Sequence, residues 1–303
     1  MSDLISREVL RPWNILIACE ESQAVCIEMR KRGHNAFSCD IIECSGGHPE
    51  WHIRQDVLPL LNGRCTFSTM NGATHTIPDR WDLIIAHPPC TFLTVTGNRW
   101  FNVERYGDKA RQRLQDRKEA AEFFMAFATA DCPRIIIENP IGYMSTVYRK
   151  PDQIIHPYMF GDAARKATCL WLIGDVKPLV PTNVVEPVII KYKNGRGTDN
   201  PWHMETMKLP PAERARARSK TFPGIARALT EQMTPDLSGG QVKTDLISRE
   251  AAKAYIDVGH LRSPTEKCFS ELDVVRMLDR FPAVDAEPVR HSAWECEGDG
   301  YFF

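Results

Sequence analysis

Three features that would narrow the function are missing from this 303-residue sequence. No run of about 18 apolar residues occurs, so no segment is expected to cross a membrane as a helix. No Cys-x-x-Cys pair occurs, and the ten cysteines are scattered, which favours reduced thiols in a cytoplasmic protein over a disulfide framework. The first residues are mixed and polar and carry no secretory pattern.

The sequence also lacks an excess of charge of either sign, because its formal net charge is -1. A basic surface that binds nucleic acid must therefore be local. Hydrophobic residues make up 43% and charged residues 25% of the chain, as in ordinary globular proteins. This length and composition predict one large α/β domain with an appendage.

The first part of the chain predicts a β-α-β unit without the usual glycine-rich turn. Residues 14–20 and 36–40 have strand character, and residues 24–32 between them have helical character. Asp40 ends the second strand at the spacing where a carboxylate reaches ribose hydroxyls in dinucleotide-type sites. Asp56 is a further acid at a turn or strand end. Because no Gly-x-Gly follows the first strand, this signal is weak on its own.

Residues 81–90, Trp-Asp-Leu-Ile-Ile-Ala-His-Pro-Pro-Cys, predict a buried parallel strand that ends in a rigid loop. The two prolines fix their φ angles and hold Cys90 at the carboxyl end of the strand. Ligands bind at that end in open α/β sheets. The Cys90 thiol is therefore either a nucleophile or a small buried side chain.

A second strand, residues 135–139, ends in an acid. Glu138 follows three isoleucines, and its burial is costly unless it has a partner or a role. Parallel strands share their carboxyl edge, so we expect Glu138 to open toward the same cleft as Cys90.

Two groups of basic residues have two open interpretations each. The first group follows an aromatic loop that contains Trp100 and Phe101, on the approach to a helix whose apolar part is residues 120–130: Arg105, Lys109, Arg111, Arg113, Arg117 and Lys118. The second comprises Arg214, Arg216, Arg218 and Lys220. Each group is either a solvated helix face or a surface that meets phosphate, with the aromatic rings available for stacking.

One further pattern would fit a metal site. Cys39, Cys44, His48 and His52 are spaced like zinc ligands. Cys39 precedes the cleft-facing Asp40 in an apolar strand, so its side chain should point the other way. We therefore expect no metal.

Four motifs resemble those of the DNA (cytosine-5)-methyltransferases. Residues 81–90 look like that family's Pro-Pro-Cys strand and loop, and residues 137–139 like its Glu-Asn motif. Residues 55–57 are similar to its Gly-Asp-Ile motif, and residues 160–174 to the segment that carries its Gln-x-Arg-x-Arg. The Ala-Cys-Glu-Glu-Ser at 18–22 and the Phe-Pro-Gly-Ile-Ala at 222–226 resemble the small members found in bacteriophages and prophages.

The resemblance implies a Rossmann-like class I S-adenosylmethionine-dependent methyltransferase fold, with a mostly parallel sheet and helices on both faces. The implied activity is methyl transfer from S-adenosylmethionine to carbon-5 of a cytosine flipped out of double-stranded DNA. Cys90 would attack carbon-6. Glu138, with a pKa raised by its apolar neighbours, would protonate ring nitrogen 3. The implied protein is a monomer in the cytoplasm of a bacterium or phage-infected cell, without a membrane partner.

The other site residues come from the same resemblance. Lys166 and Thr168 fall loosely on the arginine positions of the Gln-x-Arg-x-Arg motif, and Thr91 stands where the family usually has glutamine. Asp40 would hold the ribose of S-adenosylmethionine and Asp56 its adenine amino group. The full set of expected cofactor contacts is Cys19, Glu20, Ser22, Asp40, Ile41, Asp56, Val57 and Pro88.

The resemblance covers residues 14 to about 233 and sets the expected domain boundaries. A lead-in at 1–13 precedes a methyltransferase domain at 14–235, a linker at 236–244 and a small helical carboxyl-terminal appendage of unknown role at 245–303. Only the short segment 180–210 is left to recognise a DNA sequence.

Two alternatives remain open. An amino-methyltransferase acting on adenine N6 or cytosine N4 would carry Asp, Asn or Ser before the prolines and an aromatic residue after them, where this chain has His87 and Cys90. A non-catalytic nucleic-acid-binding protein could keep the same fold, because fold does not fix function.

Overall fold

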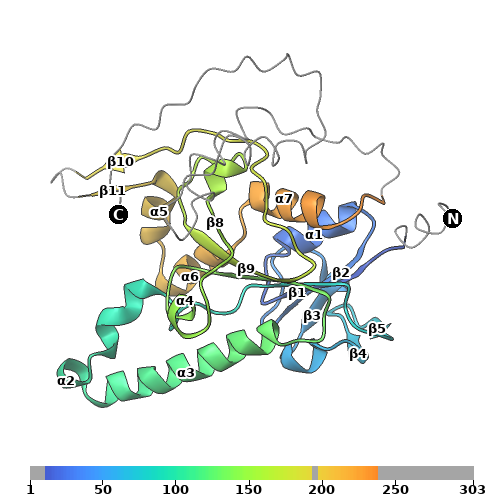
Figure 1. The fold of residues 1–303 in the computed structure, drawn as a ribbon, viewed down its shortest axis with the longest axis horizontal. Coiled ribbons are helices and arrows are strands. Elements are labelled where there is room, and N and C mark those ends of the chain that lie inside the picture. Colours follow the sequence, from blue (N-terminus) through green and yellow to red (C-terminus); the bar gives the residue numbers. More distant parts are fainter. Residues whose placement is uncertain (1–10, 193–196, 238–303) are drawn as a thin grey trace, which may run out of the picture.

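A seven-stranded sheet forms the centre of the computed structural model, which describes residues 11–192 and 197–237 (Figure 1). The strand order is β3-β2-β1-β6-β7-β9-β8. The strands are β1 (Asn14–Ala18), β2 (Asn35–Asp40), β3 (His52–Arg54), β6 (Leu83–Ala86), β7 (Arg134–Asn139), β8 (Gln153–Ile155) and β9 (Thr168–Gly174). The pairs from β3 to β7 are parallel, and β9 runs antiparallel to both of its neighbours.

The five parallel strands follow the doubly wound order. β2 and β3 are added on one side of β1, and β6 and β7 on the other, so the order of addition reverses between β1 and β6. The predicted α/β class with a mostly parallel sheet is therefore confirmed. In such sheets the crevice at the carboxyl ends of the two strands beside the reversal is the usual ligand site.

Helices cover both faces of the sheet because its central strands are apolar on both sides. On one face, α1 (Ala24–Lys31) and α7 (Pro223–Met233) pack against Ile15, Ile17 and Ile85 (Figure 1). α1 ends where Gly33 adopts a left-handed φ of 89°, which confirms the predicted stop.

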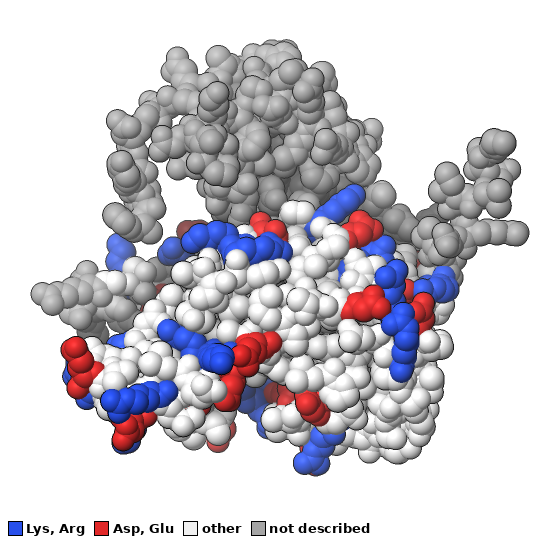
Figure 2. Space-filling view, turned by 60° about the horizontal axis from the view of Figure 1, so that its bottom comes forward, with Lys and Arg blue, Asp and Glu red and all other residues white. Residues whose placement is uncertain are grey.

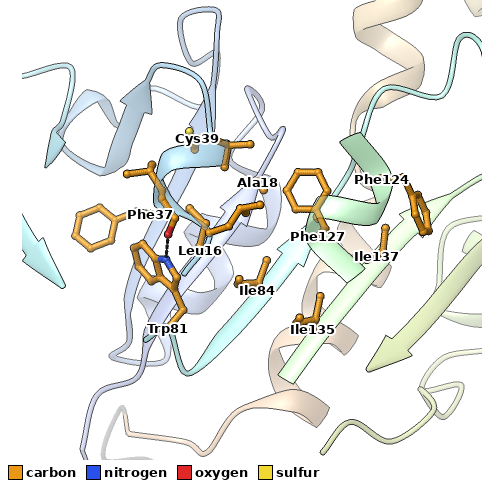
Figure 3. Close-up of a cluster of buried hydrophobic side chains, with 14 of the residues drawn as sticks. Leu16, Ala18, Phe37, Cys39, Trp81, Ile84, Phe124, Phe127, Ile135 and Ile137 are labelled. Atoms are coloured by element: carbon orange, nitrogen blue, oxygen red, sulfur yellow. Dashed lines mark hydrogen bonds between the residues drawn. The ribbon is translucent and has the colours of Figure 1, made fainter. Parts of the chain in front are cut away.

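On the other face, the carboxyl-terminal part of α3 (Asp108–Ala128) places Phe124 and Phe127 over Ile84 and Ile137 (Figure 3). A hairpin of β4 (Cys65–Ser68) and β5 (Thr74–Ile77) extends this cluster. Trp81 closes the cluster, where its indole nitrogen donates a 2.7 Å hydrogen bond to the Leu60 carbonyl (Figure 3).

The helix whose apolar part was predicted at residues 120–130 begins at Asp108. Its first half is polar and extends beyond the sheet, where no apolar periodicity is needed (Figure 1). Residues 201–219 form α5 (Pro201–Met207) and α6 (Pro211–Ser219), and α6 carries Arg214, Arg216 and Arg218 of the second basic group. Each of these helices begins at a proline, which the first helical position tolerates.

The remaining elements are short. They are α2 (Val103–Tyr106), α4 (Met144–Val147), the two-residue strands β10 (Ile190–Lys191) and β11 (Thr198–Asp199), and single 3-10 turns that include η3 (Val95–Phe101). Within the described ranges, no helix is long and apolar enough to cross a membrane. The lead-in before residue 11, most of the linker and the appendage at 245–303 lie outside the described residues.

Candidate active site

A cleft of about 680 Å³ opens at the carboxyl ends of β1 and β6, where the strand order reverses. The turn after β1 and Asp40 at the end of β2 form one side. The loop after β6, with His87, Pro89 and Cys90, forms the floor, and α6 forms the opposite wall. The ends of β2 and β6, which the sequence predicted to carry Asp40 and Cys90, therefore meet at one site.

The loop that carries Cys90 is held from both sides. Asn139, at the end of β7, donates a 2.8 Å hydrogen bond from its buried side-chain amide to the Pro88 carbonyl. The backbone N–H groups of Leu93 and Thr94 each donate to the Cys90 carbonyl at 3.0 Å. With the two prolines, these contacts fix the thiol at the cleft surface.

Two arginines of α3 hold the next part of the same loop. Arg113 donates to the Thr91 carbonyl at 3.3 Å, and Arg117 donates to the Phe92 carbonyl at 3.0 Å. The Arg117 guanidinium also lies 3.3 Å from the centre of the Phe101 ring, a cation–π contact. Neither predicted interpretation describes these two side chains, because they brace the loop that carries Cys90.

Other basic residues of α3 pair with acids on the same helix. Arg111 lies 2.5 Å from Asp108, and Lys118 lies 3.8 Å from Glu122. On the face drawn in Figure 2, basic and acidic side chains are interspersed and are not gathered by sign. These residues fit the interpretation of a solvated helix face.

Cys90 keeps its proton more strongly than a free thiol. Solvent reaches the residue from the cleft, but the surrounding protein desolvates the sulfur, and this is the main cause of its raised pKa. The charge of Glu138 raises the pKa further, and that of Lys166 opposes it. The resting side chain is therefore a thiol, and a nucleophilic role requires a group that takes its proton.

Glu138 forms a pair with His87 beside Cys90. The His87 Nδ1 and the Glu138 Oε2 are 3.0 Å apart, and His87 Nε2 is buried without a hydrogen-bond partner among the described residues. A small hollow next to the cleft is lined by both side chains, and His87 lines the cleft as well. The pair thus lies at the boundary between the two spaces.

The expectation of a raised pKa for Glu138 was wrong. Burial does raise it, as its apolar neighbours predicted, but the hydrogen bond from His87 and the charges of Lys166 and His87 together lower the pKa below its ordinary value. The carboxyl group of Glu138 is therefore ionised at neutral pH. A proton that is offered to a ligand must be shared between Glu138 and His87.

Lys166 and Thr168 line the same hollow as Glu138. Lys166 is held there by a 3.2 Å hydrogen bond from its Nζ to the Arg218 carbonyl on α6. Thr168 is buried, and its hydroxyl donates to the Lys166 carbonyl at 3.4 Å. The structure thus brings all four expected catalytic residues to the cleft and its adjoining hollow.

Glu20 replaces the missing glycine-rich turn. Its Oε1 accepts from the Val25 N–H at 2.7 Å and its Oε2 from the Cys26 N–H at 3.2 Å, so its carboxylate caps α1 from inside the protein. A phosphate at this helix end would meet amides that are already satisfied. The turn can form because Cys19 and Gln23 adopt left-handed φ angles of 58° and 60°.

The other expected cofactor residues are placed unevenly. Cys19, Ser22 and Asp40 line the cleft. Ile41 is exposed, and its neighbour Ile42 lines the cleft instead.

Asp56, Val57 and Pro88 do not line the cleft. Asp56 is exposed and accepts from the Leu58 N–H at 3.1 Å. The Val57 side chain packs in the core cluster, and Pro88 is buried, with its carbonyl bonded to Asn139.

The second basic group is divided between two roles. Arg214 donates to the Leu209 carbonyl at 2.9 Å, and Arg218 donates to the Thr206 hydroxyl at 2.9 Å, so both tie α6 to the segment before it. Arg216 projects from α6 into the cleft, where its Nε lies 3.4 Å from Glu21 Oε1.

Three of the four residues that are spaced like zinc ligands make other contacts. His48 Nδ1 lies 2.9 Å from Glu50 Oε1. Cys39 is buried in the core cluster, as its strand position predicted. His52 bonds Ser38 through Nδ1 and the Ile42 carbonyl through Nε2, both at 2.9 Å. Over residues 11–192 and 197–237, no three His, Cys, Asp or Glu side chains gather in a way that could hold a metal ion.

Sequence reasoning missed four residues of the site: His87, Asn139, Glu21 and Arg216. His87 and Asn139 lie next to the predicted Cys90 loop and Glu138, so their proximity along the chain was an available signal. Glu21 and Arg216 are joined only by the fold.

Models of known protein families and curated proteins were compared with the sequence, and neither comparison found a match.

Proposed function

We propose that this chain is an S-adenosylmethionine-dependent DNA (cytosine-5)-methyltransferase that acts through Cys90. The observation that carries the proposal is the Cys90 thiol, fixed at the cleft floor beside the His87–Glu138 pair. A nucleophile next to a carboxyl group that exchanges protons is the arrangement that attack on a pyrimidine ring needs.

The cleft suits a nucleoside cofactor without phosphate. Its volume of about 680 Å³ is that of a small-molecule site. Asp40 offers a carboxylate from the end of β2, where ribose hydroxyls bind in related sheets. Because Glu20 already caps α1, a pyrophosphate would be disfavoured there. When bound, S-adenosylmethionine supplies an electrophilic methyl group.

The proton balance of the attack fits the resting charges of the site. The raised pKa of Cys90 and the lowered pKa of Glu138 place the proton on sulfur before reaction. When the sulfur bonds carbon-6 of cytosine, it gives up that proton, and ring nitrogen 3 gains one. The His87–Glu138 pair can carry the proton between them. Carbon-5, made nucleophilic by this addition, would take the methyl group that S-adenosylmethionine supplies. Loss of the carbon-5 proton to water and of the sulfur from carbon-6 then restores the ring, and the proton on ring nitrogen 3 returns through the pair to the Cys90 sulfur.

The substrate must enter as a single base. Cys90 lies inside the cleft, so a cytosine in a duplex reaches it only after it has flipped out of the stack. Double-stranded DNA is accordingly the proposed partner.

Nucleoside mass spectrometry tests the proposal. The purified chain is incubated with double-stranded DNA and S-adenosylmethionine, and the DNA is then digested to nucleosides. We expect 5-methyldeoxycytidine from the wild type and none from Cys90→Ala. Methylation of adenine N6 or cytosine N4 would favour an amino-methyltransferase and overturn the proposal, and an unmodified digest would favour a binding protein. Bisulfite sequencing of the product reads the target sequence.

A further inference from the structure

The cleft contains a carboxylate that the reaction described above does not use. Glu21 follows Glu20, and only 7% of its side chain is exposed. Its two carboxylate oxygens are buried and accept no hydrogen bond from any residue that the structure describes. Both residues line the cleft, but Glu20 uses its oxygens on α1, whereas those of Glu21 are left for a ligand.

The nearest cation comes from the opposite wall. Arg216 Nε lies 3.4 Å from Glu21 Oε1, a long contact, and half of the Arg216 side chain is exposed. Within the described part of the chain, no other carboxylate lies within ion-pair distance of Arg216. The neighbouring Arg214 and Arg218 are already bonded to the segment before α6. Glu21 and Arg216 thus meet at the cleft in one long ion-pair contact, which leaves both Glu21 oxygens without a hydrogen bond from the described residues.

We propose that Glu21 and Arg216 form a subsite for a zwitterionic α-amino-acid group. The ammonium of such a group has three donors for the unpaired oxygens of Glu21, and its carboxylate fits the planar fork of Arg216. A ligand that carries both charges would satisfy both side chains at once. An anionic ligand such as a phosphate would be repelled by Glu21.

This inference rests on the proposed function and deepens it. S-adenosylmethionine carries an α-amino-acid group at one end and a nucleoside at the other. With Asp40 at the nucleoside end, the subsite assigns the orientation of the cofactor in the cleft. The amino-acid end lies toward α6, and the ribose toward β2.

Calorimetric titration with two nucleosides tests the subsite. S-adenosylhomocysteine carries the amino-acid group, and 5′-methylthioadenosine lacks it but keeps the adenine, ribose and thioether. We expect Glu21→Gln and Arg216→Met each to weaken S-adenosylhomocysteine binding by about 10- to 100-fold, the loss of one charge-assisted hydrogen-bonded contact. Binding of 5′-methylthioadenosine should be unchanged, which also shows that the variants are folded.

A control variant removes one charge outside the cleft. Glu205 lies on α5 and pairs with Lys208 at the surface. The Glu205→Gln variant should bind both nucleosides as the wild type does. Equal losses in Glu205→Gln would indicate a general charge effect and overturn the subsite. Wild-type affinities that are equal for the two nucleosides would overturn it too, without touching the proposed activity.

A second probe separates the subsite from the cofactor assignment. L-Methionine carries the zwitterion without the nucleoside, and saturation-transfer NMR reports its binding at millimolar concentration. A signal with the wild type that is lost in Glu21→Gln and Arg216→Met supports the subsite. This holds even if neither nucleoside binds, a result that would overturn only the proposed cofactor. If L-methionine gives no signal and neither nucleoside binds, the subsite is overturned as well.

Discussion

The buried Glu20 gives the fold a pH-dependent stability. Burial raises its pKa from the ordinary 4.5 to about 7, although the nearby His87 and the α1 amides favour the charged form. Between these two values the folded state holds a proton that the unfolded state has lost. The stabilisation by protonated Glu20 is therefore fully present below pH 4.5 and is lost as the pH rises through 7.

The size of the effect follows from the shift in pKa. One pKa unit corresponds to about 1.4 kcal/mol, so the full shift is worth roughly 3 kcal/mol. Glu20→Gln stays neutral at every pH and keeps an oxygen that can accept from the Val25 N–H. We expect the free energy of unfolding of the variant, minus that of the wild type, to increase by roughly 3 kcal/mol as the pH rises from 4.5 to 8.

Urea unfolding at pH 5, 6, 7 and 8 measures this difference. The control is Glu28→Gln on the same helix, where Glu28 pairs with Lys31 at the surface. Its stability should follow the wild-type curve within ~0.5 kcal/mol at each pH. A Glu20→Gln difference that stays constant over this range would refute the reasoning.

Two further predictions concern the supports of the Cys90 loop. Asn139→Ala leaves the Pro88 carbonyl without its buried donor, and we expect urea unfolding to show a loss of ~1–3 kcal/mol; a loss below ~0.5 kcal/mol would contradict the role of this bond. Arg117→Met keeps the aliphatic packing but removes the donor to the Phe92 carbonyl, so amide hydrogen exchange in residues 91–101 should become faster. The neighbouring change Lys118→Met removes only a surface pair and should leave exchange as in the wild type, and equal rates in both variants would speak against the brace.

Much of the fold followed from local patterns. Buried parallel strands such as residues 83–86 are apolar on both faces, so their sequence is a continuous apolar run. The carboxyl edge that parallel strands share correctly predicted that Glu138 lies near Cys90. The start of α3 at Asp108 could not be predicted, because the part of a helix that leaves the sheet has no apolar periodicity to detect.

The electrostatics of the site could not be predicted in the same way. The pKa of Glu138 depends on His87, which is 51 positions away along the chain, and on Lys166. Local sequence shows the apolar neighbours that raise this pKa, but not the distant partners that lower it. For the same reason the sequence alone does not show the contacts of Arg117 and Arg216. They depend on how α3 and α6 pack against loops that are distant along the chain.

Covalent trapping tests the central claim, the nucleophilic role of Cys90, most directly. Double-stranded DNA carrying 5-fluorocytosine is incubated with the chain and S-adenosylmethionine, and adducts are resolved on a denaturing gel. We predict an adduct with the wild type and with Cys44→Ser, a control thiol that does not line the cleft, and no adduct with Cys90→Ser. An adduct that survives in Cys90→Ser, or its absence from the wild type, would contradict the account.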